Sequence, residues 1–365
     1  MENFHLNTRV RMGADALTAL DEYRDKRALI VTDSFLATTE HFAQVRAHLG
    51  EVVVFDKVLP NPTTSLVAEG TQLAVVCEPF VIIAYGGGSA MDTAKAIHMI
   101  TTEHGMAAPG GLIAIPTTSG SGSEVTSYAV ITDDATHAKT ALVSPDLVAK
   151  LAILDPTAVA GCPPRTTADS GMDVLAHAVE AHVSSGACDF SDALSEKAVR
   201  LVFENLERCY RNGGDLAART HMHNASTLAA AAFDNVGLGI VHSISHAVGS
   251  HYPVAHGRLN AILLPHVISF NAEHSEHAAA RYAQLGRIVS PSSTGRAAIS
   301  TLIARIEKLN RALDIPARLT EAGVDRDVVR IASEITGAAL ADTCTRTNPA
   351  KVDASDLERI MIAAL

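Results

Sequence analysis

Short apolar runs alternate with helical stretches through the first half of the chain. The alternation of apolar and polar residues over 4–12 predicts a half-exposed strand. Four continuous apolar runs are typical of strands covered by helices on both faces, and they span 27–33, 52–55, 81–85 and 112–115. Apolar residues recur at helical spacing around 37–48, 64–77 and 89–101. This repeated strand–helix order predicts an α/β domain built on a doubly wound, Rossmann-like parallel sheet.

The pattern changes near Leu154. From about residue 163 onward, Ala- and Leu-rich segments with apolar residues at helical spacing take over, namely 189–210, 216–233, 275–288 and 295–312. We therefore predict an α/β domain over residues 1–160 and an all-helical domain over residues 161–365. Because no linker, repeat or low-complexity tract separates them, we expect the two domains to pack closely with a ligand-binding cleft between them.

Composition and charge narrow the class of protein. The 365 residues are 47% apolar and 19% charged, which is enough apolar material for a substantial core. No stretch approaches the about 20 uninterrupted apolar residues of a membrane span, and the N-terminus lacks the features of a signal peptide. The net charge of −11 with no basic cluster argues against nucleic-acid binding, and five separated cysteines suit reduced thiols. We expect a soluble cytoplasmic protein without nucleic-acid or membrane partners.

A glycine triplet indicates an anion site. The predicted strand 81–85 runs directly into Gly86, Gly87, Gly88 and Ser89, and a helical stretch follows. Glycine lets the backbone approach a phosphate closely, and the free N–H groups at a helix start favour its negative charge. The alternative is a tight strand-to-helix turn, because glycine turns are common. The motif is not GxGxxG, so the usual dinucleotide fingerprint is absent.

Two further features favour a nucleotide ligand. The segment 116–124 follows another apolar strand with a run of hydroxyl and glycine residues that can hydrogen-bond a ribose or a base edge, although ordinary loops share this composition. Asp33 ends the strand 27–33. A carboxylate there accepts hydrogen bonds from an adenosine ribose and repels a 2′-phosphate, which favours NAD over NADP. It is equally suited to cap a helix.

Acidic and histidine residues recur at a spacing that suits metal binding. Asp173 and His177 are four residues apart in a helical segment, and His242 and His246 repeat that spacing. His256 stands between Pro253 and Gly257, which indicates a loop before the next helix. One carboxylate and three imidazoles suit Fe(II) or Zn(II). The alternative is an exposed Asp–His hydrogen bond together with core histidines that have ordinary polar partners.

In this order, the motifs resemble the iron-containing (group III) alcohol dehydrogenase family. The resemblance runs nearly the full length and is carried by segments 86–95, 116–126, 171–181, 235–249 and 253–257. It implies a dinucleotide-binding domain over 1–160 and a helical metal-binding and catalytic domain over 161–365. It also implies Fe2+ as the metal, with Zn2+ as a substitute, and NAD(H) as the hydride carrier.

The same resemblance implies roles for individual residues. It makes Asp173, His177, His242 and His256 the metal ligands, and it places His246 in the catalytic cleft, where we expect it to relay a proton. Positions implied to bind the nucleotide are Asp33, Gly86, Gly87, Gly88, Ser89, Thr117, Thr118, Lys139 and Phe233. Among these, 86–89 form the pyrophosphate loop, the two threonines lie on the adenine side, and Phe233 lies near the nicotinamide and the substrate.

One branch of the family matches more closely. Segments 3–9, 222–228 and 346–349 resemble the propanol dehydrogenases of bacterial propanediol-utilisation microcompartments and the related ethanolamine-pathway enzymes. This implies interconversion of a short aldehyde, such as propionaldehyde or acetaldehyde, with its primary alcohol. It also implies a homo-oligomer, a dimer or larger, with shell or enzyme partners inside a microcompartment. Tyr128 departs from the pattern, because some relatives carry a smaller polar residue there.

Other functions on the same scaffold remain as alternatives at this stage. A glycerol-type dehydrogenase and a dehydroquinate-synthase-like lyase share the two-domain architecture. A lyase of that kind retains NAD during turnover, so net NADH consumption separates the two chemistries. A non-catalytic microcompartment component is a further alternative, and the complete ligand set and glycine loop argue against it.

Overall fold

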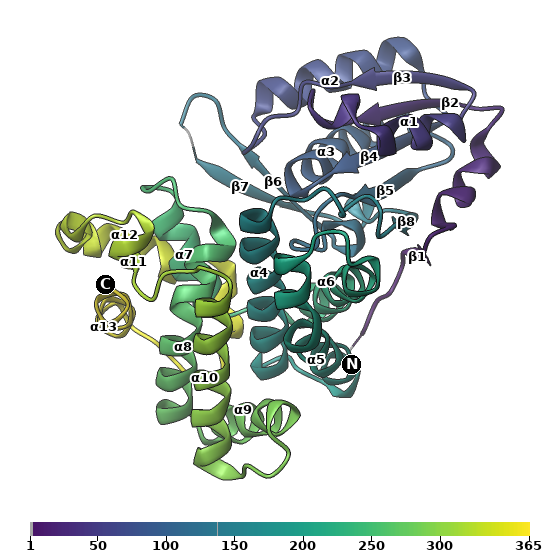
Figure 1. Ribbon diagram of the computed structural model, residues 1–365. Helices are drawn as coiled ribbons and strands as arrows, with labels where there is room; N and C mark the ends of the chain where they lie inside the picture. Colours follow the sequence, from purple (N-terminus) through teal and green to yellow (C-terminus); the bar gives the residue numbers. More distant parts are fainter. Residues whose placement is uncertain (1–2, 137) are drawn as a thin grey trace. The chain divides into compact units, whose positions relative to one another are not determined.

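The computed structural model describes residues 3–136 and 138–365. These residues form two compact units (Figure 1). One unit spans His5–Cys162, and the other spans Pro163–Leu365 together with Asn3 and Phe4. The change from one unit to the other therefore falls where the strand-rich sequence gives way to helical sequence.

The first unit is built on a six-stranded sheet in which every neighbouring pair is parallel. The strands, in spatial order, are β1 (Arg9–Met12), β8 (Leu151–Leu154), β5 (Leu112–Pro116), β4 (Val81–Gly86), β2 (Arg27–Val31) and β3 (Glu51–Phe55). The four apolar runs of the sequence are strands β2, β3, β4 and β5, so this prediction is confirmed. Chain order reverses between β2 and β4, which makes their carboxyl ends the switch point where such sheets bind ligands.

Helices cover both faces of this sheet. They are η1 (Ala16–Tyr23), α1 (Glu40–Ala47), α2 (Thr64–Cys77) and α3 (Gly88–Glu103), with short η2 (Leu36–Thr38) before α1. Leu29 and Val31 share a buried cluster with α2 and α3, whereas Ala28 and Ile30 share another with η1 and α1. Successive strand residues point to opposite faces, so continuous apolar runs are needed to fill both layers. Each fully buried Leu or Ile contributes about 1.5–3 kcal/mol to folding.

Two features near the sheet differ from the sequence prediction. Strand β1 covers only Arg9–Met12, because Phe4 instead stacks on Phe190 with ring centroids 5.6 Å apart. This contact belongs to the helical unit, so the alternating pattern overestimates the strand. The sequence also did not predict the antiparallel hairpin of β6 (Tyr128–Thr132) and β7 (Lys139–Val143).

The hairpin is held to helix α3 by a buried lysine. Lys95 is 1% exposed, and its Nζ donates to the carbonyl oxygens of Thr126 and Tyr128, both at 2.7 Å. Hydrogen bonds from a charged donor are stronger than neutral ones and satisfy a group that would be costly to bury alone. The hairpin's position is therefore set by a side chain from a distant part of the sequence.

The second unit is all-helical, as the sequence predicts. Its α-helices are α4 (Pro164–Val183), α5 (Asp189–Arg211), α6 (Leu216–Val236), α7 (Ile240–Gly249), α8 (His256–His274), α9 (Glu276–Val289), α10 (Gly295–Ala312), α11 (Leu319–Ala322), α12 (Ala332–Ala341) and α13 (Ala354–Ala363). Helix α4 contacts α5, α6, α8 and α9 and is buried almost throughout residues 167–183. A helix surrounded in this way is a central element on which side chains can be held rigidly.

No single helix in the part of the chain that the structure describes is long and apolar enough to cross a membrane. Helices α6 and α7 meet the length and composition criteria only as a pair, and they are bent by 101° relative to each other.

His182, near the end of α4, is fully buried among polar groups, and Asp192 Oδ1 lies 3.7 Å from its Nδ1. Its Nδ1 lies 3.3 Å from Ser195 Oγ, and its Nε2 lies 3.2 Å from Gln284 Oε1. Burial, helped by the positive charge of Arg281, lowers the pKa of His182 to about 4, whereas an unfolded chain has a histidine pKa of about 6.5. Between these values the unfolded chain binds a proton that the folded protein does not.

We predict that this histidine makes the protein acid-labile. As pH falls from about 6.5 towards 4, the free energy of unfolding should decrease by up to about 1.4 kcal/mol per pH unit from this group alone. His182→Gln should flatten that dependence in urea denaturation at pH 5, 6 and 7. The matched control is His277→Gln on the exposed surface of α9. The same change of slope in both variants would contradict the prediction.

Candidate metal and nucleotide sites

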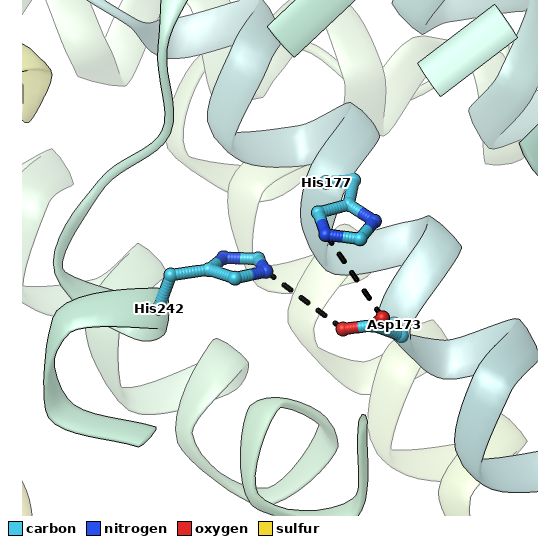
Figure 2. Close-up of side chains that lie close together, drawn as sticks. All are labelled: Asp173, His177 and His242. Atoms are coloured by element: carbon cyan, nitrogen blue, oxygen red, sulfur yellow. Dashed lines mark ion pairs between the residues drawn. The ribbon is translucent and has the colours of Figure 1, made fainter. Parts of the chain in front are cut away.

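Three of the predicted metal-ligating residues lie together in the helical unit (Figure 2). Asp173 and His177 come from adjacent turns of α4, and His242 comes from α7. His177 Nε2 lies 3.9 Å from Asp173 Oδ2, and His242 Nε2 lies 3.7 Å from Asp173 Oδ1. One donor atom from each residue lies within 4.8 Å of the others, and all three side chains are buried.

The fourth predicted ligand, His256, lies beside this group. Its Nε2 is 3.5 Å from Asp173 Oδ1, although it does not join the set whose donor atoms all lie within 4.8 Å of one another. The loop position expected for His256 is wrong, because it is the first residue of α8. The neighbouring glycine explains the error: a Cβ on Gly257 would lie 1.9 Å from the backbone oxygen of Asp169. That glycine marks a close crossing of α8 and α4 rather than a turn.

The oxygen and nitrogen atoms of these side chains are spaced in a way that suits a divalent ion. Asn260 Nδ2 lies 2.7 Å from Asp173 Oδ1, 3.1 Å from His242 Nε2 and 3.0 Å from His256 Nε2. One carboxylate oxygen and two ring nitrogens thus lie within hydrogen-bond distance of one amide nitrogen, which has only two hydrogens to give. Ligands about 2.1 Å from one tetrahedral ion would lie about 3.4 Å apart, slightly less than the spacings here. The residues therefore suit a cation with N and O ligands.

The electrostatics of the cluster are dominated by buried carboxylates. Burial alone would raise the pKa of Asp173, but the surrounding histidines hold it far below its usual range. Burial lowers the pKa of His242, yet the carboxylates of Glu180 and Asp173 outweigh this and raise it to about 9. The cluster is thus strongly polarised, with negative charge on both sides of the His242 ring.

Two side chains that contact the start of helix α7, Glu180 and Asn348, were not predicted from the sequence. Glu180 Oε1 accepts the backbone N–H of Val241 at 2.7 Å, and Asn348 Oδ1 accepts that of Ile240 at 3.4 Å. Helix α7 begins after Gly239, which has no capping side chain, and a Cβ there would lie 2.7 Å from Glu180 Oε1. Glu180 follows Asp173 by seven residues, so its position on the same helical face was the available signal.

His246 lies next to the cluster in a different environment. Its Nδ1 is 2.8 Å from Asp342 Oδ2, its ring stacks on His256 with centroids 5.0 Å apart, and its side chain is 47% exposed. It groups with Asp342 and Cys344 rather than with Asp173. Burial acts to raise the pKa of Asp342, but hydrogen bonds led by the one from His246 lower it to about 2. The sequence did not single out Asp342.

Phe233 also lies against the cluster. It is on α6, and its ring centroid is 4.5 Å from that of His177. An aromatic ring at this distance restricts the histidine's rotation and excludes water from that side. Its proximity to a nucleotide stays a prediction.

In the α/β unit, the structure brings the glycine loop and the hydroxyl-rich loop together. Helix α3 begins at Gly88, after an extended Gly87 without a side-chain cap. A Cβ on Gly87 would lie 3.3 Å from Thr118 Oγ1, and Thr117 N donates to Gly86 O at 2.9 Å. Ser89 is in the first turn of α3. The backbone N–H groups of this first turn are therefore suited to an anion.

Asp33 lies on the same edge of the sheet, just after β2, whereas Lys139 lies on the hairpin of β6 and β7. Asp33 Oδ1 accepts the backbone N–H groups of Phe35 and Leu36, both at 2.9 Å. Asp33 thus has the helix-capping role that was one of the two alternatives from the sequence. Its role in selecting NAD over NADP stays a prediction. Lys139 is the first residue of β7 and is exposed. Its place near a cofactor also stays a prediction.

Comparison with known proteins identifies the family. Residues 7–156 match the iron-containing alcohol dehydrogenase family, and residues 167–365 match the C-terminal part of the Fe-containing alcohol dehydrogenase family. The chain therefore belongs to the iron-containing alcohol dehydrogenase family. It is an NAD-dependent oxidoreductase that interconverts alcohols and aldehydes, and its family implies iron and NAD(H).

Individual relatives span the whole chain. The chain is 41% identical to the 1-propanol dehydrogenase PduQ of Citrobacter freundii, over 99% of each protein. It is 36% identical to the NAD-dependent methanol dehydrogenase of Bacillus methanolicus, over 100% of each. An alcohol dehydrogenase structure from Oenococcus oeni matches with a TM-score of 0.92 at 31% identity, again over 100% of each chain.

We predict that Gly257→Ala disrupts the cluster. The added methyl would meet the backbone of Asp169 on α4, which cannot yield as a flexible side chain would. Stability should fall by about 1–3 kcal/mol or more. Metal content after anaerobic reconstitution should also fall, because α4 carries Asp173 and α8 carries His256.

Gly337→Ala is the matched control for this substitution. Gly337 lies within α12, is exposed, and an added Cβ there meets nothing within 4 Å. The control should gain about 0.4–1 kcal/mol in urea denaturation and keep its metal. A Gly257→Ala protein that also gains stability would show that the two helices do not cross as described.

Proposed function

We propose that this enzyme reduces a two- or three-carbon aldehyde, such as propionaldehyde or acetaldehyde, to its primary alcohol with NADH. The observation that carries the proposal is the buried cluster of Asp173, His177 and His242 donor atoms, with His256 Nε2 beside it at 3.5 Å from Asp173 Oδ1. The identity of 41% to a 1-propanol dehydrogenase supports the short aldehyde. The reverse reaction uses the same groups, as microscopic reversibility requires.

Asp173, His177, His242 and His256 would hold Fe2+, and the same donors suit Zn2+ as a substitute. The bound ion supplies Lewis acidity to a carbonyl oxygen, and bound NADH supplies the hydride. The chain's part is to fix the donors on three packed helices, α4, α7 and α8. Phe233 packs on His177 and keeps water from that side of the cluster.

The nucleotide would be held at the carboxyl edge of the sheet. In this proposal Gly86, Gly87, Gly88 and Ser89 bind the pyrophosphate through backbone N–H groups at the start of α3. The other proposed contacts are Thr117 and Thr118 on the adenine side, Asp33 at the ribose, Lys139, and Phe233 near the nicotinamide. Asp33 disfavours a 2′-phosphate by charge repulsion, which favours NAD over NADP.

His246 would supply the proton that the product oxygen needs. Its Nδ1 is tied to Asp342 Oδ2 at 2.8 Å, which leaves Nε2 as the atom that gives up and regains the proton. Its exposed side chain lets it exchange protons with water. The stacked ring of His256 holds it in this position.

We also propose a cytoplasmic homo-oligomer, a dimer or larger, that resides inside a bacterial microcompartment with shell or enzyme partners. The similarity to the propanol dehydrogenases supports this setting. Size-exclusion chromatography with light scattering tests the oligomeric state, and co-purification with shell proteins tests encapsulation.

The first test is anaerobic NADH oxidation with propionaldehyde. Protein loaded with Fe2+ should consume NADH, and the chelated protein and a His256→Ala variant should not, because each lacks part of the metal site. Net consumption of NADH also excludes a lyase that retains NAD. A metal-loaded wild type that is inactive with propionaldehyde and acetaldehyde would contradict the short-aldehyde proposal, and a chelated protein with full activity would contradict the metal.

A second prediction concerns the proton donor. His246→Ala should lower kcat by about 100- to 10,000-fold while metal content stays close to that of the wild type. The control is His251→Ala, because His251 is an exposed histidine just beyond the end of α7. This variant should keep the kcat and the metal content of the wild type. Loss of metal in His246→Ala would make His246 a ligand and refute the relay assignment.

A further inference from the structure

Glu180 is a buried carboxylate with two hydrogen-bond donors on another helix. It lies on α4, two turns beyond Asp173, and is 3% exposed. Its Oε1 accepts the backbone N–H of Val241 at 2.7 Å, and its Oε2 lies 2.5 Å from Nδ1 of His242. Both donors belong to the first turn of α7, so one carboxylate joins the two helices that carry three of the cluster residues.

This contact determines which nitrogen of His242 carries hydrogen. A carboxylate can only accept hydrogen bonds, so Nδ1 donates to Oε2. A histidine that binds a metal must be neutral, and the neutral ring with its hydrogen on Nδ1 has its lone pair on Nε2, the nitrogen that lies 3.7 Å from Asp173 Oδ1. The opposite tautomer would set two lone pairs against each other and turn a hydrogen towards the cluster.

We propose that Glu180 is a positioning residue of the metal site, which holds His242 in the tautomer and orientation that direct Nε2 at the ion. This inference rests on the proposed metal site. Carboxylates that accept from the outer nitrogen of a metal-bound histidine fix its ring and make it a better ligand. Glu180 and Asp173 are both buried carboxylates. Their combined negative charge balances the charge of one divalent ion.

A purely structural role for Glu180 predicts a different behaviour. As a helix cap, Glu180 would act like Asn348, whose Oδ1 accepts the N–H of Ile240 at the same helix start. Both side chains approach Gly239 closely, but no contact described for Asn348 reaches His242. Substitutions of Glu180 and Asn348 can therefore distinguish stabilisation of α7 from orientation of the metal ligand His242.

The test compares Glu180→Gln with Asn348→Ala. Glutamine has the same shape but only one acceptor oxygen, so it cannot accept from both Val241 and His242. Glu180→Gln should weaken Zn2+ and Fe2+ binding by about 10- to 100-fold, measured by competition with a chromophoric chelator. Asn348→Ala should lower the melting temperature by at least as much and keep wild-type metal affinity. Equal metal affinity in Glu180→Gln and wild type would overturn the inference.

A double variant tests whether Glu180 acts through His242. In a His242→Ala background, Glu180→Gln should cause no further loss of metal affinity, since the ring that it positions is absent. A full additional loss would make Glu180 an independent contributor and refute the positioning role. A wild-type protein that binds neither metal would instead refute the proposed metal site itself.

One measurement does not need a substitution at Glu180. In wild-type protein loaded with diamagnetic Zn2+, spectra of 15N-labelled histidine should show His242 with its hydrogen on Nδ1. The signal is assigned by its loss in His242→Ala. A hydrogen on Nε2 would overturn the inference even if Glu180→Gln failed to fold.

Discussion

The buried contact between Glu180 on α4 and the first turn of α7 is the interaction on which the cluster depends. One carboxylate oxygen caps a helix that starts after a glycine, and the other orients the His242 ring. A buried carboxylate is costly unless every lone pair has a donor, so this contact is stable only when α4 and α7 are both in place. The geometry of the cluster is therefore a property of the packed helical unit rather than of either helix alone.

Close packing of small residues gives the same unit its rigidity. Gly257 lets the start of α8 approach the backbone of Asp169 on α4, and this crossing brings His256 beside Asp173. Side chains held on packed helices keep their geometry better than side chains on loops. Asn260 and Phe233 then fill the space around the histidines, so the donor atoms meet in a buried environment where a divalent ion would interact strongly with them.

In the α/β unit, the proposed nucleotide site is formed by loops at one edge of the parallel sheet. Parallel strands end together at one edge, and the loops after β2, β4 and β5 bring Asp33, the glycine triplet and Thr117 to that edge. Backbone N–H groups at the start of α3 attract an anion without any charged side chain. The chain thus holds a proposed nucleotide site made mainly of backbone and a proposed metal site made of side chains.

Local sequence patterns were enough to predict the parallel sheet, the helical second half and the i, i+4 pairs Asp173–His177 and His242–His246, because these depend on periodicity within one segment. The same patterns could not place Glu180 against His242, Asn348 against the start of α7, or Asp342 against His246, since each partner lies in a distant part of the chain. They also misread the glycine after His256 as a sign of a loop. Its absent side chain serves a helix crossing, and only the packing of α8 on α4 decides that.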